Sequence, residues 1–98
     1  MIVIARITAK KGQEKAMEKA FLELMPLVEK EQGTLEYRLH RSLGDPRVFL
    51  FMESYADSAA LAAHSSSPYL TDLFGKISPM LASEPEIILF EEIGRIKR

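Results

Sequence analysis

The 98-residue chain contains no cysteine, no tryptophan and no asparagine, and it has only two histidines. Without cysteine it can form no disulfide, no thiolate metal site and no cysteine nucleophile. Thirteen basic residues face fourteen acidic ones, so the chain lacks the positive field that draws a protein to nucleic acid or an anionic membrane. We therefore expect neither as a partner, and we expect the protein to be cytoplasmic.

Long hydrophobic runs are also missing. No stretch approaches the roughly 18 apolar residues of a membrane span. The short apolar segment from Met1 to Ala5 lacks the basic leader of a signal peptide. A chain of this length predicts one soluble domain over residues 1–98 that buries a core without metals or disulfides.

The spacing of apolar residues predicts helices and strands in a simple order. The predicted elements are a strand over 2–8, a helix over 13–31, strands over 34–41 and 47–55, helices over 58–65 and 68–77, and a strand over 86–93. The strands come from β-branched or alternating segments, and the helices from apolar residues three and four apart. This order predicts an α+β fold of the ferredoxin-like type, β-α-β-β-α-α-β, with the helices on one face of an antiparallel sheet.

Several single residues predict where these helices bend, begin and end. Pro26 removes one helical hydrogen bond, so we expect a kink or a tightened last turn there, with Gly33 as the stop. Asp57 or Ser58 can cap the second helix, and Pro68 suits the first turn of the third.

Three of the predicted strands are apolar on both faces, although helices can cover only one face of the sheet. Ile2 and Ile4 alternate with Val3 and Ala5, and the strands over 47–55 and 86–93 show the same pattern. Leaving such side chains in water would cost many kcal/mol at about 25 cal/mol per Å². The sequence therefore predicts a homodimer packed sheet to sheet.

The candidate chemistry lies where the strand over 47–55 passes into the following helix. Glu53 and Tyr55 share a strand face, and His64 lies on the helix face that points toward the sheet. A partly buried imidazole near a carboxylate can act as a general base at neutral pH. The alternative is structural: His64 can simply be hydrogen-bonded at the edge of the core, and Glu53 can cap the helix or make a structural hydrogen bond.

Other kinds of site find no support in the sequence. No pair of His, Asp or Glu residues has a recognisable metal-ligand spacing, so we predict no metal. Ser65, Ser66 and Ser67 are not part of a nucleophile elbow. The five glycines are dispersed and form no phosphate-binding loop.

Four segments together resemble the antibiotic biosynthesis monooxygenase domain family, and in particular its small, stand-alone branch similar to quinol monooxygenases. These segments are 33–37, 49–55, 60–64 and 67–69, and the resemblance covers nearly the whole chain. Its most specific part is Glu53, the aromatic Tyr55 two positions later, and His64 on the next helix. The resemblance implies a dimeric α+β barrel with a pocket between sheet and helices.

The resemblance also implies an activity: oxidoreductase chemistry without a cofactor, acting on a quinol or another small phenolic substrate. His64 would be the catalytic base or substrate anchor, and Glu53 its polar partner. The implied pocket walls are aromatic: Tyr37, Phe51, Tyr55, Tyr69 and Phe74.

The absence of asparagine and tryptophan limits which activities of the family the resemblance can imply. Haem-degrading relatives use asparagine and tryptophan around the porphyrin, and monooxygenases of aromatic polyketides tend to use them near the substrate. Both residues are missing here, which disfavours haem degradation and puts the polyketide activity in doubt. Two alternatives remain open. One is an isomerase that acts on a small phosphorylated carbonyl compound, like the isomerases that take part in autoinducer-2 breakdown. The other is a ligand-binding dimer without catalysis.

Overall fold

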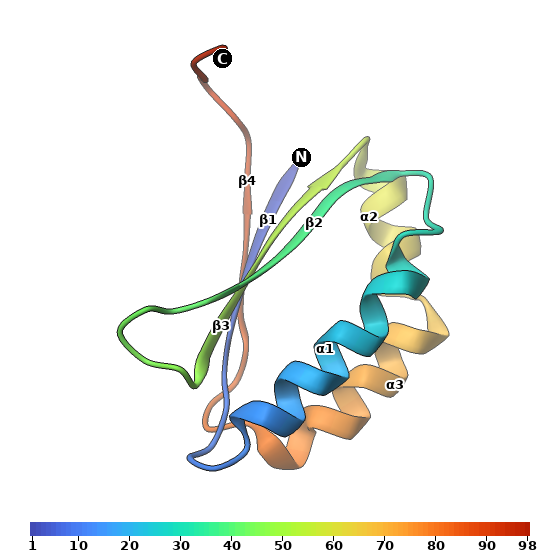
Figure 1. Cartoon of the computed structure of the whole chain (residues 1–98). Coiled ribbons are helices and arrows are strands. Elements are labelled where there is room, and N and C mark those ends of the chain that lie inside the picture. Colours follow the sequence, from blue (N-terminus) through green and yellow to red (C-terminus); the bar gives the residue numbers. More distant parts are fainter.

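The computed structural model describes all 98 residues, which form one antiparallel sheet covered on one face by helices (Figure 1). The sheet order is β2-β3-β1-β4, and every neighbouring pair is antiparallel. The elements in chain order are β1 (Ile2–Thr8), α1 (Glu14–Val28), β2 (Thr34–Arg41), β3 (Val48–Tyr55), α2 (Ser58–Ser65), α3 (Pro68–Ile77), a single 3-10 turn (Ser78–Met80) and β4 (Glu86–Phe90). The predicted ferredoxin-like α+β fold is confirmed.

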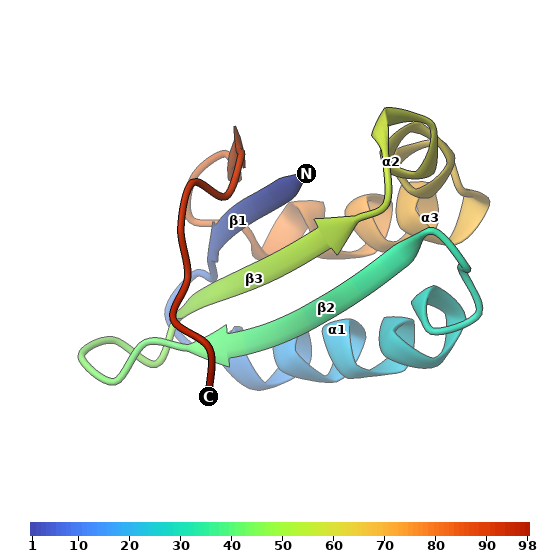
Figure 2. The ribbon, with the colours of Figure 1, turned by 90° about the horizontal axis from the view of Figure 1, so that it is seen from above.

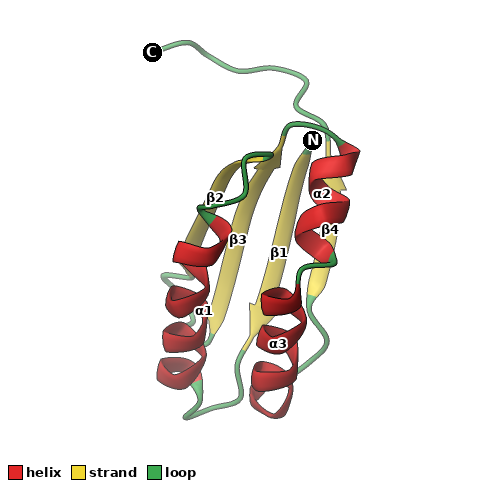
Figure 3. Cartoon of the chain, turned by 90° about the vertical axis from the view of Figure 1, so that its right-hand side faces the viewer, coloured by secondary structure: helices red, strands yellow, loops and turns green.

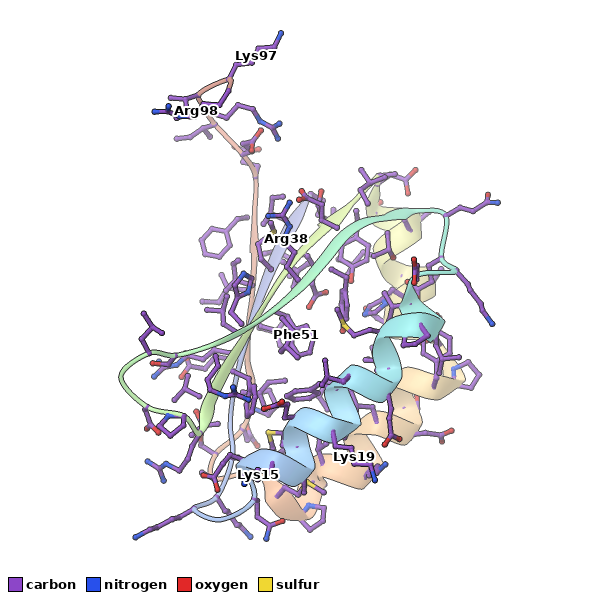
Figure 4. All side chains as sticks on the ribbon, in the orientation of Figure 1. Lys15, Lys19, Arg38, Phe51, Lys97 and Arg98 are labelled. Carbon is purple, nitrogen blue, oxygen red and sulfur yellow. The ribbon has the colours of Figure 1, made fainter.

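The helices form a second layer against the sheet, and the core lies between the two layers (Figures 2 and 3). The inward residues of β1 and β3 alternate with outward ones, as the period of two requires. Phe21 of α1 packs edge-on against Phe49 and Phe51 of β3, with ring centroids 5.4 and 4.9 Å apart. Figure 4 shows Phe51 pointing from the sheet toward the helices.

The predicted starts of α2 and α3 are confirmed. The Asp57 carboxylate accepts a hydrogen bond of 2.8 Å from the backbone N–H of Ala60, which caps α2. Pro68 is the first residue of α3, where its missing N–H costs no helical hydrogen bond. Ser42 to Pro46 forms the predicted turn between β2 and β3.

The end of α1 differs from the prediction. The helix stops at Val28, and the following N–H groups of Lys30 and Glu31 bond three residues back, which is the tightened turn expected after Pro26. Gly33 is not the helix stop. A Cβ atom at Gly33 would lie 2.5 Å from the Cβ of Ala60 in α2, so this glycine is needed for a close approach between two segments.

Two strands also depart from the expected pattern. A bulge between Thr34 and Glu36 leaves Leu35 unpaired and exposed, instead of on the inner face with Tyr37. The last strand ends at Phe90 rather than Ile93, and residues 91–98 extend away from the sheet (Figure 1). No helix is long and apolar enough to cross a membrane.

The face of the sheet opposite the helices carries a continuous set of apolar side chains. Ile4 of β1 lies beside Met52 of β3 and Ile88 of β4, and Ile2 lies beside Phe90. Ile88 and Phe90 are 51% and 49% exposed. We call this set, completed by Leu50, the outer apolar face.

Candidate functional site

A cavity of about 140 Å³ lies between the sheet and the helices α2 and α3. Eleven of its fourteen lining residues are hydrophobic, and the others are Glu53, His64 and Ser65. Two wall residues on β4, Ile87 and Leu89, are about half exposed, so the cavity opens to solvent along this edge strand. The result is an apolar pocket with few polar groups, the usual composition of a small-molecule site.

His64 enters this cavity from α2, and its imidazole is held from behind by Glu31. The residue is only 4% exposed. Its Nδ1 lies 2.9 and 3.1 Å from the two carboxylate oxygens of Glu31. The Ser67 hydroxyl donates a 2.7 Å hydrogen bond to the His64 carbonyl, which fixes the end of α2. The predicted inward orientation of His64 is confirmed, but its hydrogen-bond partner is Glu31 rather than Glu53.

Glu53 reaches the same cavity from β3 and is 6% exposed. Its Oε1 accepts a hydrogen bond of 2.5 Å from the Tyr55 hydroxyl. Burial raises the pKa of Glu53, against the opposing effects of the Tyr55 hydrogen bond and of His64. A carboxyl group with a raised pKa in an apolar pocket can exchange a proton more readily near neutral pH than an exposed one.

Three polar atoms of residues that line the cavity make no hydrogen bond within the protein: His64 Nε2, Glu53 Oε2 and the Tyr37 hydroxyl. No fully buried side-chain nitrogen or oxygen lacks a hydrogen bond, so these three atoms keep contact with accessible space. Burial, with the nearby charges of Glu53 and Glu31, raises the pKa of Tyr37, which therefore stays a neutral phenol. The cavity thus offers an imidazole nitrogen, a carboxyl oxygen and a hydroxyl to a ligand.

The predicted aromatic walls divide into two groups. Tyr37, Phe51 and Phe74 line the cavity. Tyr55 and Tyr69 do not line it; each donates its hydroxyl hydrogen to a carboxylate instead, Tyr55 to Glu53 and Tyr69 to Glu31. Both tyrosines therefore hold the acidic residues of the site in place.

Sequence reasoning missed Glu31, which follows α1 in a polar stretch between Lys30 and Gln32. Nothing in that stretch distinguishes it from a solvated loop. The close approach of the loop to α2 at Gly33 accompanies the contact between Glu31 and His64, but it shows only in the folded structure.

The charge distribution of the cavity limits its chemistry. No lysine or arginine is among the lining residues, and nowhere do three acidic, histidine or cysteine side chains converge as metal ligands do. The site can bind a small apolar molecule and can move a proton at His64 Nε2 or at Glu53. It has no lysine or arginine with which to bind a phosphate group.

The fold is a small ferredoxin-like α+β domain with a pocket that Glu53 and His64 line, and comparison with known proteins gives its family. The model of the antibiotic biosynthesis monooxygenase family matches residues 1–76. The chain belongs to this family. No curated protein matches it.

Solved structures share the fold of this chain. One, described as an antibiotic biosynthesis monooxygenase, is 26% identical with a TM-score of 0.89, over 96% of this chain and 100% of that one. A protein from Pseudomonas aeruginosa is 27% identical with a TM-score of 0.88, over 95% and 93% of the two chains. A protein of unknown function from Nitrosomonas europaea is 26% identical with a TM-score of 0.86, over 99% and 92%.

Proposed function

We propose that the protein is a cofactor-independent monooxygenase that acts on a small phenol or quinol. The single observation that carries the proposal is that His64 lines an apolar cavity with its Nδ1 held by Glu31 and its Nε2 free of any hydrogen bond within the protein. In this arrangement His64 is the base that removes a phenolic proton. Glu53 Oε2 binds a second hydroxyl of the same substrate.

The reaction needs no electron donor other than the substrate. A hydroquinone and one O₂ give a hydroxyquinone and one water: one oxygen atom enters the ring, the other leaves as water, and the ring supplies all four electrons. Deprotonation at His64 makes the ring electron-rich enough to reduce O₂. The apolar walls, including Phe51 and Phe74, exclude water from the reactive intermediates.

The size of the cavity supports a small substrate. An engineered cavity of about 150 Å³ in another protein holds a benzene molecule, and the space here is about 140 Å³. One ring therefore fits beside His64, and a second ring or a side chain has to extend toward Ile87 and Leu89, where the cavity opens. The lack of a lining cation argues against a phosphorylated substrate.

Oxygen consumption with simple hydroquinones tests this proposal. We expect protein-dependent O₂ uptake above spontaneous oxidation, with one atom of ¹⁸O₂ in the product and the other in water. His64→Gln should lower the rate by about 10²- to 10⁴-fold, the usual contribution of a general base. The matched control is His40→Gln, because His40 is exposed, does not line the cavity, and makes its one side-chain hydrogen bond to the Leu50 carbonyl.

Three results would contradict the proposal. The first is equal O₂ uptake by wild type and His64→Gln. The second is conversion of a phosphorylated carbonyl compound under strict exclusion of oxygen, which would identify an isomerase. The third is ligand-induced thermal stabilisation without turnover of any hydroquinone, which would identify a binding protein.

We also propose that a second copy of the chain covers the outer apolar face. The face spans three neighbouring strands, and burying each large apolar side chain contributes about 1.5 to 3 kcal/mol. Arg6 with Glu86 and Arg38 with Glu36 place charges of both signs beside it, which suits pairing of the face with itself around a twofold axis.

Sedimentation measures this association directly. We expect a dimer at micromolar concentration, and we expect Ile88→Glu to shift it toward monomer. Leu43→Glu is the control, because Leu43 is a fully exposed residue in the turn between β2 and β3, away from the face. A wild-type monomer at micromolar concentration would refute the dimer.

A further inference from the structure

Glu31 joins three elements that surround the back of the site. It lies three residues beyond the end of α1, yet its side chain is only 17% exposed. The carboxylate accepts hydrogen bonds from Thr34 at the start of β2, from His64 of α2 and from Tyr69 of α3. A loop glutamate with three donors from three elements is not a solvated surface residue.

These donors keep Glu31 ionised. Burial alone would raise its pKa, but the hydrogen bonds from Thr34, Tyr69 and His64 outweigh burial, and the net effect lowers the pKa. An ionised carboxylate has no hydrogen to donate and can only accept. The His64 nitrogen that lies 2.9 Å from it must therefore carry a hydrogen.

This requirement fixes the tautomer of His64. A neutral imidazole has one N–H, and with that hydrogen on Nδ1 the lone pair is on Nε2. The groups around the ring are Glu31 behind it, Tyr37 on β2, and Tyr55 with Glu53 on β3. No lysine or arginine forms an ion pair with either of the two carboxylates.

We propose that Glu31 is a positioning residue that holds His64 in the Nδ1–H tautomer, so that Nε2 presents its lone pair to the cavity. The catalytic meaning of this tautomer rests on the proposed function, since only a proton-accepting Nε2 can deprotonate a phenol. The tautomer itself does not, because it can be measured without substrate. Tyr69 and Thr34 act on His64 indirectly, because their hydroxyl groups hold the Glu31 carboxylate in its orientation.

A long-range ¹H–¹⁵N correlation spectrum measures the tautomer at a pH where both imidazoles are neutral. In the wild type we expect His64 to carry its hydrogen on Nδ1. In Glu31→Ala we expect a shift toward Nε2–H, the form that a free histidine side chain favours in water. His40 is an internal control, because its Nδ1 lies 3.0 Å from the Leu50 carbonyl, which Glu31 does not touch.

Two further variants keep the test decisive if Glu31→Ala folds poorly. Glu31→Gln retains the shape of the side chain and removes its charge, and it should also weaken the preference for Nδ1–H. Glu29→Ala is the matched control, because Glu29 is exposed in the same loop and its carboxylate makes no hydrogen bond. An Nε2–H wild type, or an Nδ1–H form that persists in both Glu31 variants, would overturn the proposal.

Kinetics provide the second measurement. Glu31→Ala should lower kcat at least about tenfold, with little change in KM. The scale is that of metal sites, where loss of the partner that orients a histidine ligand costs about 10- to 100-fold. A change in KM alone would show that Glu31 shapes the pocket and does not position the base. If no hydroquinone is oxidised by the wild type, the proposed function fails, while the spectrum still decides the role of Glu31.

Discussion

Replacing Gly33 with alanine tests how the loop after α1 is fitted against α2. The new Cβ would lie 2.5 Å from the Cβ of Ala60. Carbon atoms pack best at about 3.5 to 4.0 Å, so the two segments must separate by about 1 Å. Neither contact atom is the end of a flexible side chain, and the strain therefore falls on the backbone.

We expect Gly33→Ala to destabilise the fold by about 1 to 3 kcal/mol, the usual cost of overpacking. For a domain of this size that corresponds to a fall in Tm of about 5 to 20 °C. The same 1 Å would stretch the His64–Glu31 hydrogen bond, now 2.9 Å, beyond useful geometry. Hydroquinone oxidation should therefore fall together with stability.

The matched experiment removes the methyl group of Ala60 in α2, both alone and in combination with the methyl group added at Gly33. Ala60→Gly alone should cost about 1 kcal/mol through lost helix propensity. In the double variant Gly33→Ala/Ala60→Gly the contact is relieved, so its stability should return to about that of Ala60→Gly. Urea unfolding of all four proteins, at one protein concentration because of the proposed dimer, gives the coupling energy. Additive effects of the two substitutions would refute the close-approach argument.

Three further predictions concern the hydrogen bonds of the site and its supporting helix. Burial raises the pKa of Glu53 above the unfolded value of 4.5, so the ionisation of Glu53 lowers the stability of the fold above that pH. Glu53→Gln should therefore increase Tm more at about pH 7.5 than at about pH 4. An equal change in Tm at the two pH values would contradict this reasoning. Tyr55→Phe should cost about 1 to 3 kcal/mol in urea unfolding, since it leaves a buried carboxylate oxygen without its donor; an unchanged unfolding midpoint would show that water replaces the hydroxyl. Asp57→Ala should cost about 0.5 to 2 kcal/mol through the lost cap of α2, and differential scanning calorimetry that detects no loss would show that α2 is held by packing alone.

The sequence predicted a helix or strand well where the pattern and the structure it predicts involve the same few residues. Alternation located β2, the proline of Ser67-Pro68 located the start of α3, and the Asp57 carboxylate caps α2 as its position suggests. Gly33 shows the opposite case. A glycine after a helix is typical of a stop, and only the position of Ala60, 27 residues later, reveals that it serves a close approach.

The candidate site likewise has features that the sequence predicts and features that depend on tertiary packing. Periodicity placed His64 on the inward face of its helix and Glu53 on the inward face of its strand, because both depend only on the geometry of one element. Which carboxylate would meet His64 depended on how a loop, two helices and a strand pack together. That packing selected Glu31, which no spacing pattern distinguishes.

The sequence by itself therefore determined the order of strands and helices, the inward faces, and the absence of cysteine, asparagine and tryptophan chemistry. Tertiary structure alone decided that Glu31 binds His64 and that Tyr55 and Tyr69 hold carboxylates instead of lining the cavity. It also decided that no lysine or arginine lines the cavity. The physical reason is the distance along the sequence over which each interaction acts. Helix and strand periods act over a few residues, whereas hydrogen bonds between side chains 33 residues apart exist only once the layers have packed.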